Sequence, residues 1–212
     1  IITIGYSGKA DDGLIIGNNI HGNQTIFVDN WPNRTRFWLP SIDHPSDKAM
    51  VEYYIHAPKE WKVIANGYSP RKPTKTPYNA IGPKEDRLTW SWKTTVPIPT
   101  YNMVIGAADL EINIIGLAAC GNAPNSMRKD GCIEVTYWVY PEDVENAKIS
   151  FKRADKMVDY FTDLIGPYPY EKLANVQSST RFGGMENASA IFYSEKGIAE
   201  GRNIEGTVSH EI

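Results

Sequence analysis

The first two thirds of the chain carry short stretches rich in β-branched and aromatic residues, which is typical of β-strands. In residues 88–95 apolar and polar residues alternate, so one face of that strand is expected to be buried. Further strands are predicted at residues 50–56, 61–65, 101–105, 111–117 and 133–140, with a Pro- and Gly-rich loop at 71–84. Short strands separated by turn signals predict a β-sandwich or a saddle-like stack of sheets.

The pattern changes near Pro141. Apolar residues then recur in steps of three and four from Val144 to Ile165, which predicts one helix over residues 144–165. Asp143 is expected to cap this helix, and Gly166 is expected to end it. Strands are predicted again at residues 173–177 and 188–193. We therefore expect an N-terminal β domain over residues 1–140 and a second, α+β domain that begins at residue 141.

Composition and charge exclude several classes of protein. The chain has 212 residues, of which 42% are hydrophobic, so it can bury a core and is not expected to be disordered. Its 22 basic and 25 acidic residues give a net charge of −3, which offers no electrostatic case for nucleic acid or an anionic membrane. No apolar run approaches the roughly 18 residues that a membrane helix needs.

The two ends of the sequence look internal to a longer protein. Ile1 is neither a natural start nor the beginning of a signal peptide, and the sequence stops at Ile212 within what looks like a helix. We therefore expect the N-terminal domain to lack its first strands and the second domain to be truncated.

The two cysteines, Cys120 and Cys132, flank a predicted loop between two strands. Paired strands can bring two such sulfurs within bridging distance, but two buried thiols are an equally good interpretation. A bridge would imply an oxidising compartment.

Two short segments are candidates for chemistry, and the first is residues 183–187, Gly-Gly-Met-Glu-Asn. Gly183 and Gly184 have two interpretations: they shape an ordinary hairpin turn, or they leave bare backbone against which an extended ligand can lie. In the second case Glu186 would meet the ammonium group of that ligand. A peptide α-amine has a pKa near 7.7–8.0 and is largely charged at neutral pH, so one fixed carboxylate can recognise it.

The second segment is His210-Glu211, which alone is no more than a common surface dipeptide. In a helical His-Glu-x-x-His motif, two imidazoles one turn apart can hold Zn²⁺, and the intervening Glu can accept a proton from water. The second His of such a motif would fall two residues beyond Ile212.

Together the two segments resemble the signatures GxMEN and HExxH of the M1 (gluzincin) zinc aminopeptidases. The resemblance extends along the chain in the family's order, through residues 33–45, 57–67, 97–106 and 166–173. It implies an N-terminal β domain followed by the first helix and strands of a thermolysin-like catalytic domain. It also implies that the parent protein removes N-terminal residues from peptides.

For residues 183–187 the resemblance implies contacts with the peptide substrate. Glu186 would bind the substrate's α-amine. Gly183, Gly184 and Met185 would line the strand against which the peptide lies, and Asn187 would support that loop.

For the end of the chain the resemblance implies that His210 is a zinc ligand and Glu211 the general base. Zinc is therefore expected in the full-length parent. The 212-residue chain, with one zinc ligand, is expected to hold zinc weakly or not at all and to be inactive.

The expected partner of the protein is a peptide with a free N-terminus. Neither a nucleic-acid partner nor a membrane-spanning segment is expected. Many bacterial relatives are exported, so a periplasmic or extracellular location is expected, with the cytoplasm as the alternative.

One position departs from the family, whose members often carry Glu or Gln as a second amine contact before the arginine–aromatic–proline segment. Trp31 occupies that position, with Asp29 nearby. Either Asp29 takes the role, or Trp31 narrows the pocket for the first side chain. Two other hypotheses for the function are a non-catalytic M1-like scaffold for protein binding and a dual-function enzyme that resembles leukotriene hydrolase.

Overall fold

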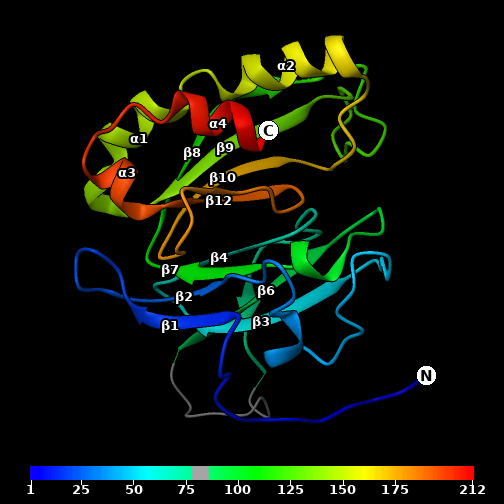
Figure 1. Cartoon of the computed structure of the whole chain (residues 1–212). Helices are drawn as coiled ribbons and strands as arrows, with labels where there is room; N and C mark the ends of the chain where they lie inside the picture. The colour runs from blue at the N-terminus through cyan, green and yellow to red at the C-terminus, as the bar shows by residue number, and fades with distance from the viewer. Residues whose placement is uncertain (78–85) are drawn as a thin grey trace.

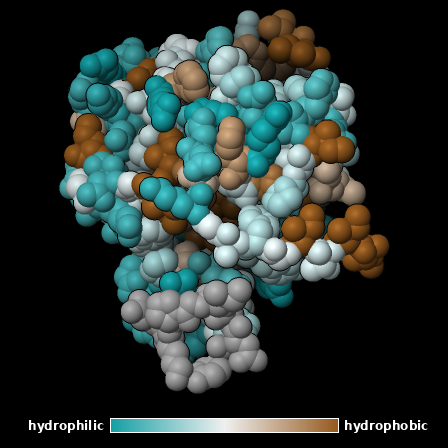
Figure 2. All heavy atoms as spheres, turned by 60° about the horizontal axis from the view of Figure 1, so that its bottom comes forward, coloured by the Kyte–Doolittle hydropathy of each residue, from teal (hydrophilic) through white to brown (hydrophobic). Residues whose placement is uncertain are grey.

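The computed structural model describes residues 1–77 and 86–212 and confirms a mostly β fold. Three sheets are stacked in layers, and helices cover the outer face of the last one (Figure 1). On the face shown in Figure 2, apolar side chains lie in separate small groups among polar ones. In the part of the chain that is described, no helix is long and apolar enough to span a membrane.

The N-terminal part forms two antiparallel sheets. One has four strands in the order β1 (Leu14–Asn18), β2 (Gln24–Val28), β7 (Ile105–Ala108) and β4 (Lys62–Ala65). The other has three, in the order β3 (Glu52–Pro58), β6 (Arg87–Lys93) and β5 (Thr74–Lys75). Two short 3₁₀ turns, η1 (Thr35–Phe37) and η2 (Thr100–Asn102), connect strands of this part.

The third sheet has five strands and mixed direction. Its order is β11 (Gly184–Met185), β12 (Ala190–Ser194), β10 (Leu173–Ser178), β9 (Ile133–Val139) and β8 (Glu111–Ala118). β10 runs parallel to β9 and β12, whereas β8 and β11 are antiparallel edge strands. Parallel pairs need crossover connections. The helices α1 and α2 supply the one from β9 to β10, whereas the connection from β10 to β12 contains the short strand β11.

Four helices follow the turn η3 (Pro141–Asp143): α1 (Val144–Phe151), α2 (Ala154–Ile165), α3 (Glu195–Ala199) and α4 (Glu205–Glu211). Their apolar side chains pack with one face of the five-stranded sheet in a single cluster that includes Val135, Phe151, Val158, Tyr193 and Val208. This packing fixes α4, the helix that carries His210 and Glu211, over the sheet.

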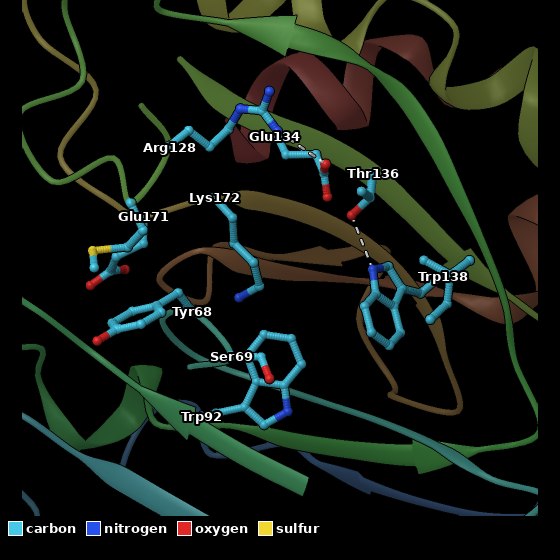
Figure 3. Close-up of a pocket in the computed structure, with 11 residues that line it drawn as sticks. Tyr68, Ser69, Trp92, Arg128, Glu134, Thr136, Trp138, Glu171 and Lys172 are labelled. Atoms are coloured by element: carbon cyan, nitrogen blue, oxygen red, sulfur yellow. Dashed lines mark hydrogen bonds and ion pairs between the residues drawn. The ribbon is translucent and has the colours of Figure 1, made fainter. Parts of the chain in front are cut away.

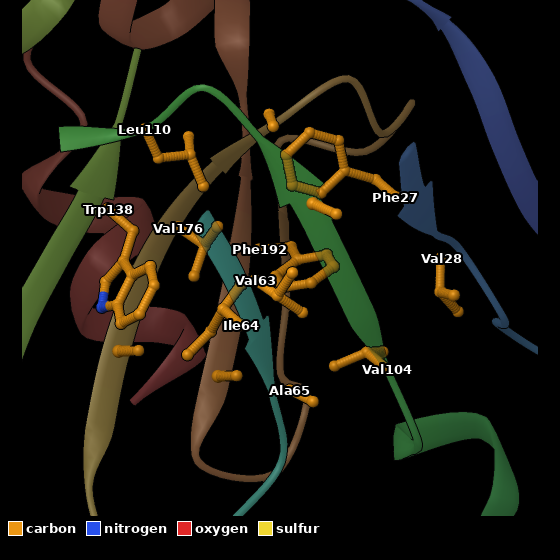
Figure 4. Close-up of a cluster of buried hydrophobic side chains, with 14 of the residues drawn as sticks. Phe27, Val28, Val63, Ile64, Ala65, Val104, Leu110, Trp138, Val176 and Phe192 are labelled. Carbon is orange, nitrogen blue, oxygen red and sulfur yellow. The ribbon is translucent and has the colours of Figure 1, made fainter. Parts of the chain in front are cut away.

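The opposite face of the same sheet packs on the N-terminal sheets (Figure 4). Phe27 of β2 meets Phe192 of β12 edge to face, with ring centroids 5.6 Å apart. Ile64, Trp92 and Trp138 belong to the same buried cluster. Since full burial of such a side chain contributes roughly 1.5–3 kcal/mol, this shared core holds the N-terminal sheets against the third sheet.

The single helix predicted over residues 144–165 is wrong, because the structure has two helices that meet at Lys152 and Arg153. Arg153 leaves the helical conformation, with φ −114° and ψ 6°. Phe151 and Ala154 are both buried on either side of this break, which lets the two helices follow different parts of the sheet. Ile165, predicted to be buried, is 78% exposed.

Asp143 occupies the N-cap position of α1, as predicted, but its side chain does not bond to the helix. Its buried carboxylate accepts hydrogen bonds from His21 Nε2 at 2.8 Å and from Gln177 Nε2 at 2.6 Å. The side chain therefore joins the β1–β2 loop to strand β10 and makes no capping hydrogen bond.

This contact predicts a pH-dependent loss of stability for His21→Gln. The hydrogen bond to Asp143, followed by the charges of Asp143, Glu142 and Glu195, raises the pKa of His21 above 6.5 and outweighs burial, which lowers it. The stabilisation is fully present below pH about 6.5 and is lost as the pH rises through the folded-state pKa. Thermal unfolding should therefore show a larger drop in Tm for His21→Gln at pH 6 than at pH 9. An equal drop at both values would contradict the ion pair.

Most predicted strands are present, with two differences. Of residues 101–105, the first two belong to the turn η2, and the strand β7 begins only at Ile105. Strand β3 continues through Pro58, because Pro58 is the last residue to pair with β6. Within the loop predicted at 71–84, residues 74 and 75 form β5, and residues 78–84 lie outside the described part.

The change of sheet falls earlier than the change of pattern at Pro141. Strands β8 and β9 precede Pro141 but belong to the five-stranded sheet with β10 and β12. The pattern near residue 141 thus marks the first helix of that layer. The division into one domain over residues 1–140 and a second over residues 141–212 remains a prediction.

The structure contains a disulfide between Cys120 and Cys132, in the loop that joins β8 and β9. Of the two interpretations that the sequence left open, the structure therefore has the bridge.

Candidate functional site

Residues 183–187 lie at an edge of the five-stranded sheet. Gly184 and Met185 form β11 and pair with Tyr193 and Phe192 of β12. The other side of β11 pairs with no strand in the described part of the chain. Its backbone N–H and C=O groups can therefore accept an extended chain as a further strand.

The C-terminal end of α4 lies over this edge strand. A Cβ atom added at Gly184 would lie 2.6 Å from both Cγ and Cδ of Glu211 and closer still to its Oε1 atom. A Cβ added at Gly183 would meet nothing within 4 Å. Of the two glycines, Gly184 is thus the one that the packing requires, because it makes room for the Glu211 side chain.

Glu186 and Glu211 influence each other electrostatically. Burial raises the pKa of Glu211, the Glu186 carboxylate raises it further, and the neighbouring His210 acts in the opposite direction. Glu186 itself is exposed. The sequence motifs therefore come together: the two acidic residues, 25 positions apart in the sequence, flank one stretch of open backbone.

The turn after β11 is held from two sides. Asn187 is buried; its backbone N–H donates to the Met185 carbonyl at 2.8 Å, and its carbonyl accepts from Ala190 N–H at 3.1 Å. The Asn102 side-chain amide donates to the Glu186 carbonyl at 3.1 Å. The turn η2 thereby fixes the backbone that presents the Glu186 carboxylate.

Sequence reasoning missed the part played by residues 100–102. Besides the Asn102 contact, Tyr101 lies close enough to Glu186 that this carboxylate, after burial, raises the pKa of the Tyr101 phenol. Residues 97–106 resemble the M1 family in sequence, which could have pointed to a role for this segment. The resemblance did not indicate which of its side chains lie near residue 186.

The contacts of Asp29 and Trp31 distinguish the two roles that the sequence left open, an amine contact from Asp29 or a pocket narrowed by Trp31. Asp29 is 3% exposed; its Oδ1 atom pairs with Arg34 Nη2, and its Oδ2 atom is buried without a hydrogen-bond partner among the described residues, so a ligand does not reach this carboxylate. Trp31 is half-exposed and meets Phe182 edge to face, with ring centroids 5.7 Å apart. The geometry therefore favours Trp31, which lies beside the segment 183–187, over Asp29 as the residue that affects a bound ligand.

His210 is exposed near the end of α4. Among the described residues, no group of three or more His, Cys, Asp or Glu side chains is arranged to hold a metal ion. Zinc sites take three or four protein ligands, so these residues do not form a zinc site by themselves.

Known proteins share sequence similarity with this chain. No family model matches the chain. It is 26% identical over 176 residues to leukotriene A-4 hydrolase of Xenopus laevis, covering 82% of this chain and 25% of that protein. It is 22% identical over 226 aligned positions to probable aminopeptidase 2 of Sulfurisphaera tokodaii, covering all of this chain and 26% of that protein.

Solved structures share the fold. An M1 zinc metallopeptidase from Deinococcus radiodurans matches 95% of this chain and 42% of its own with a TM-score of 0.69 and 22% identity. Yeast LTA4 hydrolase in complex with bestatin matches 94% and 28%, with a TM-score of 0.71 and 20% identity.

The resemblance to M1 zinc aminopeptidases is thereby confirmed in both sequence and fold. The chain spans about a quarter of the length of the curated relatives that it matches.

Proposed function

We propose that this chain belongs to an aminopeptidase that removes N-terminal residues from peptides. The observation that supports this best is the packing of Glu211 on Gly184, which brings Glu211 to the same open strand edge as Glu186. The curated relatives are an aminopeptidase and a leukotriene A-4 hydrolase.

Glu186 is proposed to bind the charged α-amine of the substrate. The peptide would lie along the free side of β11, with its backbone paired to residues 183–185, and its first residue would end at Glu186. Because an acetylated N-terminus has no ammonium group, it would lose the charge-assisted hydrogen bond and leave the carboxylate without a partner. Specificity for free N-termini follows from that difference.

Glu211 is proposed to act as the general base that takes a proton from the attacking water. Its raised pKa suits this role, because a carboxylate that is more basic accepts a proton more readily. Gly184 keeps Glu211 close to the strand where the scissile bond would lie, and proton transfer requires such proximity.

Zinc appears in the names of the structural neighbours, and we extend it to the full-length protein as a proposal. In this chain, the imidazole of His210 would be one of the ligands of the zinc ion. The 212-residue chain alone is expected to hold zinc weakly or not at all and to be inactive, and metal analysis of the purified chain tests this.

Export from the cytoplasm is likewise proposed, with the Cys120–Cys132 bridge in support.

The direct test of the function is hydrolysis of an aminoacyl amide by the full-length protein. We expect hydrolysis of the substrate with a free α-amine, little hydrolysis of its N-acetyl form, and loss of activity on chelation that zinc restores. Equal rates on the two substrates would contradict the role of Glu186. A well-folded, zinc-loaded protein without any hydrolysis would instead indicate the non-catalytic scaffold.

A further inference from the structure

A second pocket lies where the N-terminal sheets meet the five-stranded sheet, and it shares no residue with the candidate site (Figure 3). Its volume is about 320 Å³. That is at the lower end of the range for small-molecule sites, which is roughly 300–1,000 Å³.

The floor of the pocket is aromatic. Trp92 of β6 and Trp138 of β9 are almost fully buried, and their ring centroids lie 6.1 Å apart at an interplanar angle of 61°. The indole N–H groups are already used, by the Val63 carbonyl at 3.2 Å and the Thr136 hydroxyl at 3.0 Å. With 5% of Trp92 and 7% of Trp138 exposed, the two rings leave a small apolar area at the floor that an aromatic group can contact.

Lys172 completes one wall of the pocket. Its Nζ atom donates to the Ala65 carbonyl at 2.9 Å and to the Ser189 hydroxyl at 3.2 Å, and it lies 4.7 Å from the centre of the Trp92 ring. Figure 3 shows this amine directed toward Trp92, away from the charged residues at the mouth. Burial lowers the pKa of Lys172 to about 7. The side chain is thus anchored in the wall by hydrogen bonds, and its amine is directed away from a ligand at the mouth.

One positively charged and one negatively charged side chain lie at the mouth of the pocket. Arg128 Nη1 lies 3.6 Å from Glu134, and the other guanidinium nitrogens of Arg128 bind Asp130. Both Arg128 and Glu134 keep about two fifths of their side-chain surface exposed. One cationic nitrogen and one carboxylate are therefore available side by side at the mouth.

A deeper acidic group lines the same pocket. Glu171 is 4% exposed, and its Oε1 atom accepts from the Thr95 N–H and hydroxyl groups. Its Oε2 atom is buried and has no hydrogen-bond partner among the described residues. This oxygen is closed off from the pocket, so Glu171 forms part of the wall and is not a contact for a ligand.

We propose that this pocket binds a free aromatic α-amino acid. The aromatic side chain would lie against Trp92 and Trp138, the carboxylate would meet Arg128, and the ammonium group would meet Glu134. Two charges of opposite sign beside one aromatic surface fit a zwitterion better than they fit a simple anion, cation or hydrocarbon. This inference needs no catalytic activity and stands apart from the proposed function.

Isothermal titration of the full-length protein with L-tryptophan tests the proposal. We expect saturable binding at one site outside the strand edge. Indole-3-propionate, which lacks the ammonium group, and tryptamine, which lacks the carboxylate, should each bind at least about tenfold more weakly, since each loses a charge-assisted hydrogen bond.

Variants then locate the site. Glu134→Gln and Arg128→Gln change exposed side chains that can be replaced without disturbing the core, and each should weaken L-tryptophan binding about tenfold. Glu200→Gln, which removes the acidic partner of Arg202 at another exposed pair, is the matched control and should have no effect.

Three results would overturn the proposal. They are the absence of saturable binding, equal affinity for L-tryptophan and both analogues, and a loss of binding in Glu186→Gln but not in Glu134→Gln. The last result would place the amino acid at the strand edge.

Discussion

Replacement of Glu211 by Gln in the full-length protein is expected to lower kcat by a factor of about 10²–10⁴, the usual contribution of a general base. Gln has nearly the same shape as Glu but cannot accept a proton. The side chain would still fit over Gly184, so the substrate should bind with little change in KM. Steady-state kinetics on an aminoacyl amide measure both parameters.

The matched control for this variant is Glu200→Gln, which changes an exposed ion pair in the segment between α3 and α4. It should leave kcat and KM unaltered. If Glu211→Gln retained full kcat while its thermal unfolding matched that of the unaltered protein, Glu211 could not be the general base.

Gly184→Ala is expected to have the second largest effect, a loss of kcat/KM of about 10²-fold. Its Cβ atom would overlap Glu211 and force that side chain away from the strand. Misplacement of a catalytic group by about 1 Å is enough to cost a factor of that size. The backbone itself is not an obstacle, because Gly184 is not among the residues with positive φ.

Gly183→Ala provides a control on the same segment. The added methyl group meets nothing within 4 Å, so activity should remain close to that of the unaltered protein. Similar losses in both variants would mean that the segment responds to any added side chain, and that the contact between Gly184 and Glu211 is not the reason.

The hydrophobic pattern predicted most strands from residue 50 onward, because their apolar residues alternate or run continuously, but it did not predict β1 and β2. It did not predict the break between α1 and α2. Phe151 and Ala154 keep the spacing of one helix, yet Arg153 between them is not helical. It also could not show that Asp143 turns away from the helix, since its partners His21 and Gln177 are distant in sequence.

The candidate site was found from short motifs, but the arrangement of its side chains came only from the fold. Spacing alone cannot show that Glu211 rests on Gly184 and not on Gly183, because the docking of α4 on the sheet decides this. In the same way, the choice between Asp29 and Trp31 depended on the ion pair of Asp29 with Arg34, a tertiary contact.

The central claim is that Glu186 recognises the charged end of a peptide at the strand edge where Glu211 lies. The most direct measurement is the ratio of kcat/KM for a free and an N-acetylated substrate, compared between the full-length protein and Glu186→Gln. We predict a large ratio for the unaltered protein and a collapse of that ratio in the variant, through loss of activity on the free substrate alone. An unchanged ratio in a folded Glu186→Gln protein would contradict the claim.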